Sequence, residues 1–396
     1  MTRVYFDNAA TTPINGVALQ SFVDQARELG NASSLHGFGR EVRRNVEEAR
    51  EKLASLVGCE ASEVIFTGSG TEANNLAVKG IYWKRRSENK KRKVIVTSAF
   101  EHHAILDPIQ WLVDEEGAEL IEVPVSSSGY INLDYLQSAI ENRGEEIALI
   151  SIIHANNEVG TIQPIAEVVE LAKKHSIPVH SDSIQSFGKL QFSFADLGLF
   201  AMTISAHKIG GPVGVGALIL KRGVDITPLL HGGGQERDIR SGTVNAAAIV
   251  SFVSAAQAAI RNIEKNSLHV TSLREALRET IKADVPDVIF NGGELSGGEG
   301  ERLPGILNVR FPNTESDSLL LLFDAEGIAC STGSACSAGV QQPSHVLLAM
   351  GLSEKEARSS LRFSLGPENS RADIDYFHTC IKRVIERARA AYRSTA

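Results

Sequence analysis

The feature that most constrains the fold is a regular alternation of short apolar runs with longer amphipathic segments through the middle of the chain. Runs rich in β-branched and other apolar residues are expected to be strands at 63–67, 93–98, 119–123, 148–154, 178–182, 200–205 and 216–220. Segments with helical periodicity lie between them, including 71–85, 104–116 and 164–175. This alternation predicts an α/β fold with a mostly parallel sheet that is covered by helices on both faces.

The pattern changes after about Thr243. A long helical run continues through Arg261 and Arg278, and a Gly-rich stretch at 291–300 is expected to be an exposed loop. Strands are predicted at 306–311 and 361–365, and an amphipathic helix from about Arg371 closes the chain. We therefore predict a large domain of residues 15–255 and a smaller α+β domain of residues 1–14 and 256–396. A chain of 396 residues is long enough for two domains that share a site.

Composition narrows the class of protein. With 43% hydrophobic and 22% charged residues, the chain reads as globular, and no apolar run approaches the ~20 residues of a membrane span. The N-terminus lacks the pattern of a secretory signal, and a net charge of -8 argues against direct binding of nucleic acid. Four cysteines without a CxxC pair argue against a disulfide framework or a paired-cysteine metal site. We therefore expect a cytoplasmic protein.

Three segments carry candidate cofactor chemistry. Lys208 follows an apolar strand and precedes a glycine pair and a proline, so partial desolvation should lower its pKa and leave an amine able to form a Schiff base. Asp182 ends another apolar strand, where a carboxylate can hold a pyridinium nitrogen protonated or, alternatively, cap a turn.

The third segment is a Gly/Ser turn between a strand and a helix, with the sequence FTGSGTEANN at 66–75. Backbone N–H groups and hydroxyls at such a helix start are suited to phosphate. The turn is neither a Walker A loop nor the GxGxxG fingerprint, which disfavours an NAD-dependent dehydrogenase.

With these segments in this order, the chain resembles the fold-type I enzymes that depend on pyridoxal 5'-phosphate (PLP), and among them the cysteine desulfurases of the NifS/IscS type. The resemblance runs nearly end to end. It is carried by YFDNAATTP at 5–13, EHH at 101–103, HANNEVG at 154–160, HGGGQER at 231–237, RSGT at 240–243 and SLRFSLG at 360–366. It implies PLP as cofactor, L-cysteine as substrate, L-alanine as product and an obligate homodimer with shared sites.

The resemblance also implies a role for each matching residue. Lys208 would bind PLP and act as the base, Asp182 would face the pyridine nitrogen, and His102 would stack on the ring and move protons. The remaining cofactor-binding positions are Asn157 and Gln185 beside the phenolic oxygen, Gly70, Thr71, Ser205 and His207 at the phosphate, and Thr243 at the phosphate of a partner subunit. Arg362 would clamp the substrate carboxylate, with Asn157 and Asn31 assisting.

The segment CSTGSACSAG at 330–339 indicates which of the PLP-dependent reactions the protein catalyses. It is small and polar, so Cys336 is expected on an exposed loop at about 326–345, whereas Cys59 and Cys380 have helical surroundings and should be inert. It resembles the longer loop of the first desulfurase group, not the shorter one of the SufS-like group. This implies that the Cys336 thiolate takes the substrate sulfur as a persulfide and passes it to an acceptor protein, for iron–sulfur clusters or thio-modification.

Departures from the family pattern leave some points open. Cys330 and Ser337-Ala338 differ from the usual loop, which leaves the acceptor protein undetermined, and Ser183-Ile184 and His103 also differ. The alternatives are a selenocysteine lyase or a PLP aminotransferase and, from another class, a non-catalytic scaffold.

Overall fold

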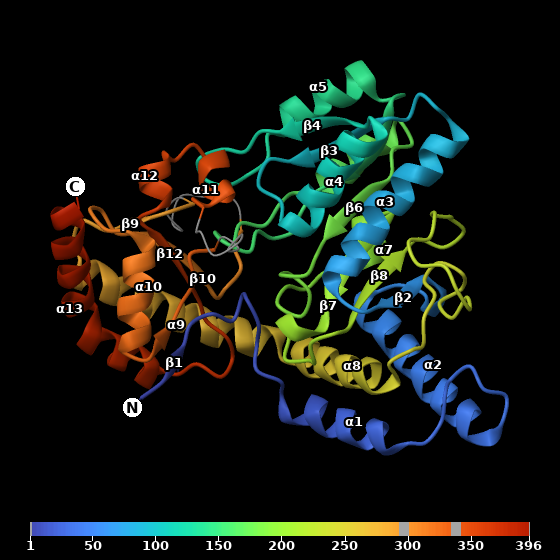
Figure 1. Ribbon diagram of the computed structural model, residues 1–396, viewed down its shortest axis with the longest axis horizontal. Helices are drawn as coiled ribbons and strands as arrows, with labels where there is room; N and C mark the ends of the chain where they lie inside the picture. The colour runs from blue at the N-terminus through green and yellow to red at the C-terminus, as the bar shows by residue number, and fades with distance from the viewer. Residues whose placement is uncertain (1, 293–300, 334–341, 396) are drawn as a thin grey trace.

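The computed structural model describes residues 2–292, 301–333 and 342–395, and its larger part is built on a seven-stranded sheet (Figure 1). In spatial order the strands are β2 (Val64–Thr67), β8 (Gly216–Leu220), β7 (Ala201–Ser205), β6 (Val179–Asp182), β5 (Ile147–Ser151), β3 (Val94–Ser98) and β4 (Glu119–Val123). Neighbouring strands are parallel except at β8, which is antiparallel to both β2 and β7. The predicted strands and the mostly parallel sheet are confirmed, with strand ends that differ by at most three residues.

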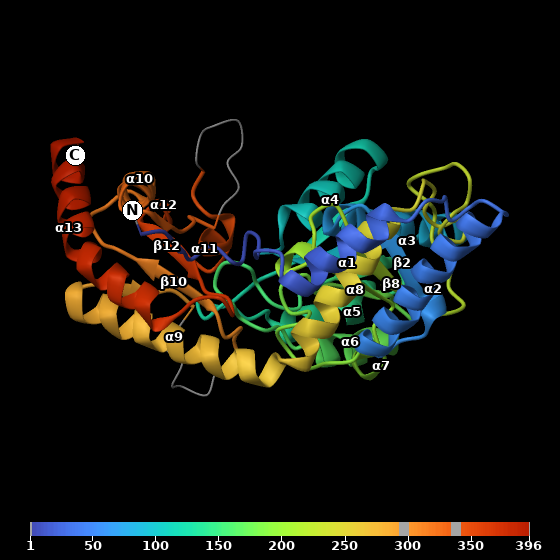
Figure 2. The same cartoon turned by 90° about the horizontal axis from the view of Figure 1, so that it is seen from below.

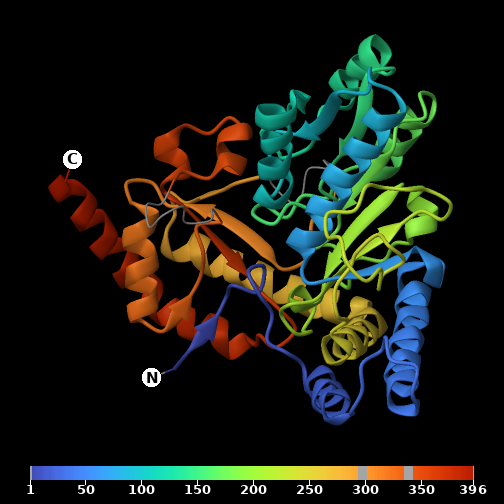
Figure 3. The same ribbon diagram turned by 45° about the vertical axis from the view of Figure 1, so that its right-hand side comes forward.

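Helices cover both faces of this sheet because alternate residues of a strand point to opposite sides. On one face α3 (Gly70–Glu88) and α4 (His103–Glu116) pack with Ile65 and Ile95. On the other face Phe66 and Val94 pack in a core shared with α2 (Gly37–Val57), α5 (Leu133–Arg143), α6 (Ile165–Lys173) and α8 (Ala246–Arg261). The short helix α7 (Phe194–Leu197) joins the same core, and α1 (Gly16–Arg27) lies along α8, as Figure 3 shows.

The smaller part of the molecule has its own core and two small sheets. β12 (Ser360–Ser364), β10 (Ile306–Arg310) and β9 (Ile289–Phe290) form an antiparallel sheet, and β1 (Val4–Tyr5) pairs in parallel with β11 (Ile328–Ala329). The helices around them are α9 (Ile263–Asp284), α10 (Ser316–Ala325), α11 (His345–Ala349), α12 (Glu354–Ala357) and α13 (Arg371–Thr395). The N-terminal strand therefore lies in the C-terminal half of the molecule (Figure 2), where the Phe6 ring packs on those of Phe363 and Phe377.

The N-terminal segment continues from β1 along β12 towards the large sheet. The Asn8 N–H donates to the Ser364 carbonyl at 3.0 Å, and the Asn8 side chain also donates to that carbonyl, at 3.1 Å. The Thr12 N–H then donates to the His207 carbonyl at 2.9 Å, beyond the end of β7. Residues 8–12 thus bridge the two parts of the molecule, and the predicted division into two domains places its first boundary directly after them.

The expected long helical run after Thr243 is two helices in the structure. α8 ends and α9 begins at Asn262, whose side-chain amide donates to the Ala258 carbonyl at 2.8 Å, and the two helix axes differ by 72°. This amide competes for a helix carbonyl, which favours a helix end over a continuous helix. No single helix in the described ranges is long and apolar enough to cross a membrane, although α8 and α9 together pass that test by length and composition only.

Only the first two residues of the Gly-rich stretch at 291–300 belong to the described part of the chain. The buried Asn291 amide donates to Asn308 Oδ1 at 2.7 Å and to Ser360 Oγ at 3.0 Å, so its first residue is fixed between β10 and β12. Residues 293–300 lie outside the described part of the chain.

Candidate active site

A cavity of about 460 Å³ lies where the carboxyl ends of β5, β6 and β7 and the start of α3 meet β12 and residues 9–10. Strand ends of a parallel sheet open to one edge, so side chains that follow them converge there. The cavity is lined by most of the residues predicted from the sequence: Gly70, Thr71, His102, Asn157, Asp182, Gln185, Ser205, His207, Lys208 and Arg362. These ten positions come from distant parts of the chain and lie in one site.

Asp182 ends β6 and is buried in the floor of this cavity. Its Oδ2 accepts from the Asn74 side chain at 2.7 Å, and its Oδ1 accepts from the Ile184 N–H at 3.0 Å. Burial raises the pKa of the carboxyl, while His102 and these hydrogen bonds act in the opposite direction. Among the described residues no lysine or arginine lies within ion-pair distance, so the carboxylate is free to take a cationic partner inside the cavity.

Lys208 follows β7 in a single turn of 3₁₀ helix formed by residues 206–208. Its ammonium donates to the carbonyls of Ala9 and Ala10, both at 2.7 Å. Burial lowers the pKa of Lys208 to about 8, and the charge of Arg362 acts in the same direction. The depressed pKa predicted from the strand-end position is therefore present, and it has a second cause, Arg362, that the local sequence does not reveal.

His102 is the N-cap of α4, and this role fixes its ring. Nδ1 accepts from the Ala104 N–H at 3.0 Å, so the neutral ring carries its proton on Nε2. Burial lowers the pKa of His102, Asp182 raises it and Lys208 lowers it further. The ring lines the cavity together with Asp182 and Lys208, as a neutral group that can donate from Nε2.

The predicted phosphate turn is a helix start that opens into the cavity. Ser69 caps α3 by accepting from the Glu72 N–H at 3.0 Å, and the N–H groups of Gly70 and Thr71 have no intrahelical acceptor because they belong to the first turn. A Cβ on Gly70 would lie 2.4 Å from Ile184 Cδ1 and 3.2 Å from Ser205 Cβ, so a larger residue there would have to displace the Ile184 side chain. Such a helix end attracts an anion.

Arg362 projects from β12 into the same space. Its Nη2 donates to Asp7 Oδ1 at 2.7 Å and its Nη1 donates to the Asn157 carbonyl at 3.0 Å, while the buried Nε has no partner among the described residues. The side-chain Oδ1 of Asn157 is also buried and accepts no hydrogen bond from the described part of the chain. Two unsatisfied polar atoms that border one cavity mark where a polar ligand would complete the site.

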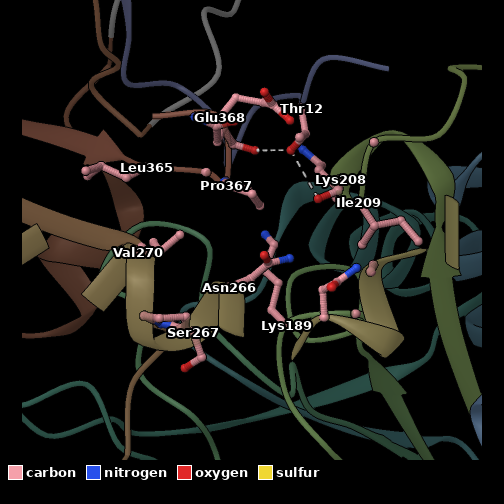
Figure 4. A pocket seen from close by; sticks show the side chains of 18 of the residues that line it. Thr12, Lys189, Lys208, Ile209, Asn266, Ser267, Val270, Leu365, Pro367 and Glu368 are labelled. Atoms are coloured by element: carbon pink, nitrogen blue, oxygen red, sulfur yellow. Dashed lines mark hydrogen bonds between the residues drawn. The ribbon is translucent and has the colours of Figure 1, made fainter. Parts of the chain in front are cut away.

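A second cavity, of about 690 Å³, lies between the N-terminal segment and the start of α9 (Figure 4). Gln185, which lines the first cavity, hydrogen-bonds to two residues that line the second. Its amide donates to the Ala9 carbonyl at 2.8 Å and accepts from Lys189 Nζ at 2.9 Å. Burial lowers the pKa of Lys189 to about 7, and Lys208 and Arg362 add to the effect. Thr12 lines the second cavity, and its hydroxyl, which has one proton to donate, lies 3.2 Å from the carbonyls of both Asn8 and Lys208.

Three ionisable residues that line the cavity were not predicted as site residues, namely Glu158, His103 and His345. Burial raises the pKa of Glu158 to about 7, and its Oε2 accepts from Ser344 Oγ at 2.5 Å. His345 Nε2 pairs with the Glu101 carbonyl at 2.8 Å, and its ring packs on His103 with centroids 4.7 Å apart. Glu158 and His103 fall inside the segments that carried the family resemblance, but the sequence does not show that a carboxylate there is buried.

Asn31 and Thr243 are predicted residues that do not line this cavity. Asn31 lies in the loop before α2, where its side chain accepts from the Ser33 N–H at 2.9 Å. Thr243 is exposed before α8, a position compatible with the predicted reach into a partner subunit. Cys336 lies outside the described residues, but it follows Gly333 by only three positions, and Gly333 lines the cavity.

The other cysteines have the surroundings of unreactive thiols. Burial raises the pKa of Cys59 to about 12 and raises that of Cys330 well above its usual range. Cys380 is buried in α13. Among the described residues no group of His, Cys, Asp and Glu side chains is arranged to hold a metal ion.

The arrangement fits PLP. The helix start at Gly70 would take the phosphate, the buried and unpaired carboxylate of Asp182 would face the pyridinium nitrogen, and Lys208 has a depressed pKa suited to bond formation with a carbonyl carbon. The unsatisfied Oδ1 of Asn157 and the Gln185 amide supply uncharged polar groups beside them. A mostly parallel sheet with this site defines a transferase of fold-type I.

The chain belongs to the aminotransferase class-V family, whose model matches residues 4–377, and within it to the cysteine desulfurases of the NifS/IscS type. It is 48% identical over 392 residues to an IscS-like cysteine desulfurase of Mycobacterium tuberculosis, covering 99% of this chain and 98% of the relative. A solved NifS-like protein superimposes with a TM-score of 0.88 at 35% identity, covering 97% of this chain and all of the other. A structure described as SspA in complex with cysteine superimposes with a TM-score of 0.78 at 33% identity, covering 93% and 100% of the two chains. The resemblance stated from the sequence is confirmed.

Proposed function

We propose that the protein is a PLP-dependent cysteine desulfurase that converts L-cysteine to L-alanine and holds the sulfur as a persulfide on Cys336. The observation that carries this proposal is that one cavity is lined by Lys208, Asp182, His102 and Arg362. Gly333 also lines this cavity, and Cys336 follows it in the sequence by three positions. Support for the substrate comes from the similar protein whose structure is described as a complex with cysteine.

Substrate binding and proton transfer are carried out by different residues of the cavity. Arg362 offers a buried Nε and a fixed guanidinium to the substrate carboxylate, which orients the amino acid in the cavity. Lys208, with its pKa of about 8, is neutral often enough near neutral pH to take the α-proton, and His102 can donate from Nε2 to an oxygen or nitrogen nearby. PLP, when bound, supplies the electron sink for the pair left by the α-proton.

Cys336 carries out the sulfur step. Its thiolate would form an S–S bond with the substrate Sγ while the Cβ–Sγ bond breaks and leaves its electron pair on Cβ. Protonation of that carbon gives the methyl group of L-alanine, and the sulfur remains as a persulfide on the protein. Three peptide units reach at most about 11 Å, so the covalent chain keeps the Cα of Cys336 within that distance of Gly333 at the cavity wall.

The setting of this chemistry is also a proposal. We infer a cytoplasmic homodimer, in which the exposed Thr243 completes the partner's phosphate site, that passes its sulfur to an acceptor protein for iron–sulfur cluster assembly or thio-modification. The full-length similarity to an IscS-like cysteine desulfurase supports this assignment.

The test is turnover of L-cysteine by the PLP-loaded protein, with alanine and protein-bound persulfide quantified together. Cys336→Ser should abolish the persulfide while the bound cofactor keeps its visible absorbance, and Cys330→Ser is the matched control because that thiol is buried with a raised pKa. Full turnover of selenocysteine but not cysteine in Cys336→Ser would favour a selenocysteine lyase. Alanine formation that depends on an added α-keto acid would favour an aminotransferase, and a protein that never takes up PLP would favour a scaffold.

A further inference from the structure

Glu158 is a buried carboxylate beside the candidate active site that has no ion-pair partner among the described residues, although the charge of Arg362 acts on it from farther away. Its side chain is 1% exposed, and none of the ion pairs among the described residues includes it. An isolated carboxylate in such surroundings is unfavourable unless hydrogen bonds compensate for the lost water. Its own N–H is held by Asn156 Oδ1 at 2.8 Å and its carbonyl accepts from Asn308 at 3.3 Å, so its backbone is fixed on both sides.

One contact of the Glu158 carboxylate is Gly333, the last described residue before the segment that contains Cys336. Gly333 has a φ of +86°, and a Cβ there would lie 2.4 Å from Glu158 Oε2. The Gly333 N–H donates to Ser331 Oγ at 3.0 Å, which holds this turn in place. The chain therefore passes directly over the carboxylate, at a distance that only glycine permits.

The other contact is Ser344, which lies beyond the same segment. Ser344 Oγ donates to Glu158 Oε2 at 2.5 Å and caps α11 by accepting from the Leu347 N–H at 3.2 Å. The next residue, His345, is held separately by the Glu101 carbonyl at 2.8 Å. Both ends of the segment thus meet at one carboxylate group.

Hydrogen bonds also connect these contacts of Glu158 to Arg362, the residue that would bind the substrate carboxylate. Ser331 and Arg362 exchange backbone hydrogen bonds of 3.1 and 2.6 Å, and Arg362 Nη1 donates to the carbonyl of Asn157, the residue before Glu158. Hydrogen bonds therefore connect Gly333, through Ser331, to Arg362 and to the residue before Glu158. A tethered group reacts at an effective concentration set by where its tether is held.

We propose that Glu158 is a positioning residue that joins Gly333 and Ser344, and thereby sets how Cys336 is presented to the substrate. The inference rests on the proposed function, because it concerns the sulfur transfer to Cys336. Glu158 need not touch the substrate or cofactor for this role. Its replacement should slow the sulfur transfer while the steps that precede it are preserved.

The experiment compares Glu158→Ala, Glu158→Gln and Ser344→Ala in the PLP-loaded protein. The readouts are the single-turnover rate of persulfide formation on Cys336, the KM for L-cysteine, and the change in cofactor absorbance on adding L-cysteine. Ser353→Ala is the matched control, because Ser353 is also an N-cap serine that donates to a glutamate, Glu356, at 2.8 Å, but it lies at α12 away from the cavity.

We expect Glu158→Ala and Ser344→Ala to slow persulfide formation by about 10- to 100-fold, with the absorbance change retained and KM within about twofold, because small misplacements of a reacting group have effects of this size. Glu158→Gln keeps an acceptor for Ser344 and should stay within about threefold of the unmodified protein, as should Ser353→Ala. The effects of Glu158→Ala and Ser344→Ala should be non-additive in the double variant, since they remove the same contact.

Unchanged persulfide rates in Glu158→Ala and Ser344→Ala would overturn the inference, as would a loss expressed only in KM. Should Glu158→Ala fail to fold, Ser344→Ala and Glu158→Gln decide the question. An unmodified protein that makes alanine without a persulfide on Cys336 would instead overturn the proposed function, so the two failures are distinguishable.

Discussion

Arg362 offers the most direct test of the proposed site, because its guanidinium is already held in place on one side. Nη2 is bound to Asp7 and Nη1 to the Asn157 carbonyl, while the buried Nε has no partner in the described ranges of the chain. A substrate carboxylate that binds along the Nε edge forms up to two charge-assisted hydrogen bonds. We expect Arg362→Leu to remove both and Arg362→Lys to keep the charge but lose the paired geometry.

The magnitude follows from those two bonds. Hydrogen bonds to charged groups contribute about 1.5–3 kcal/mol each, so two of them correspond to about 3–6 kcal/mol. At 1.36 kcal/mol for each factor of ten, kcat/KM for L-cysteine should fall by about 10²- to 10⁴-fold in Arg362→Leu. Arg362→Lys should lose about half of that free energy, or roughly 10- to 100-fold.

The assay is alanine production at saturating PLP over a range of L-cysteine concentrations. Arg310→Leu serves as the control, since Arg310 lies on the adjacent strand β10, pairs with Glu356 and does not line the cavity. Its kcat/KM should stay within about twofold. An Arg362→Leu protein with kcat/KM within about threefold of the unmodified enzyme would refute the assignment of the carboxylate clamp.

Three further predictions follow from the same structure. Asp182→Asn keeps the position of the side chain but removes its charge, so turnover should fall by about two orders of magnitude; a loss below about threefold would contradict a role opposite a pyridinium nitrogen. Because burial lowers the pKa of Lys208 from 10.5 to about 8 and the neutral amine is the nucleophile, PLP uptake by cofactor-free protein should rise with pH and level off above about 8; stopped-flow absorbance would show a rise continuing to pH 10 if this is wrong. Glu236→Ala should lower the free energy of unfolding by about 3–5 kcal/mol in urea titrations, because it removes the buried partner of Arg50 at 2.7 Å and leaves the exposed Glu47 as the ion-pair partner of that guanidinium among the described residues; a change under about 1 kcal/mol would show that Glu47 compensates for the lost pair.

The large sheet was predictable because its strands are buried on both faces and therefore read as continuous apolar runs. Asp182 and Lys208 were predictable as site residues for a related reason, since Asp182 ends such a run, Lys208 lies three residues beyond another, and the strand ends open to one edge of the sheet. The break at Asn262 was missed, because apolar periodicity continues from α8 into α9 and only the side-chain hydrogen bond to Ala258 reveals the helix end.

Local patterns did not predict how distant segments meet at the site. The contacts of Lys208 with Ala9 and of Arg362 with Asp7 join residues 199 and 355 positions apart, and no periodicity encodes such pairings. Arg362 was identified only through the family resemblance. Glu158 was inside a matching segment, yet its function depends on burial and on contacts with Gly333 and Ser344, which the sequence does not display.

The pairing of the N-terminal segment with β12 also affects how the chain folds during its synthesis. Asn8 and Ser364 are 356 residues apart, so at about 5–20 residues per second a ribosome needs roughly 20–70 s to make the second after the first. Until then the N–H groups of Asn8 and Ala9 lack their acceptors on Ser364, although all strands of the large sheet have already been made. The large sheet can therefore form first, but the Ala9 and Ala10 carbonyls that hold the Lys208 ammonium reach their final positions only after β12 has been made. The nascent protein thus acquires its sheet early and its reactive centre last.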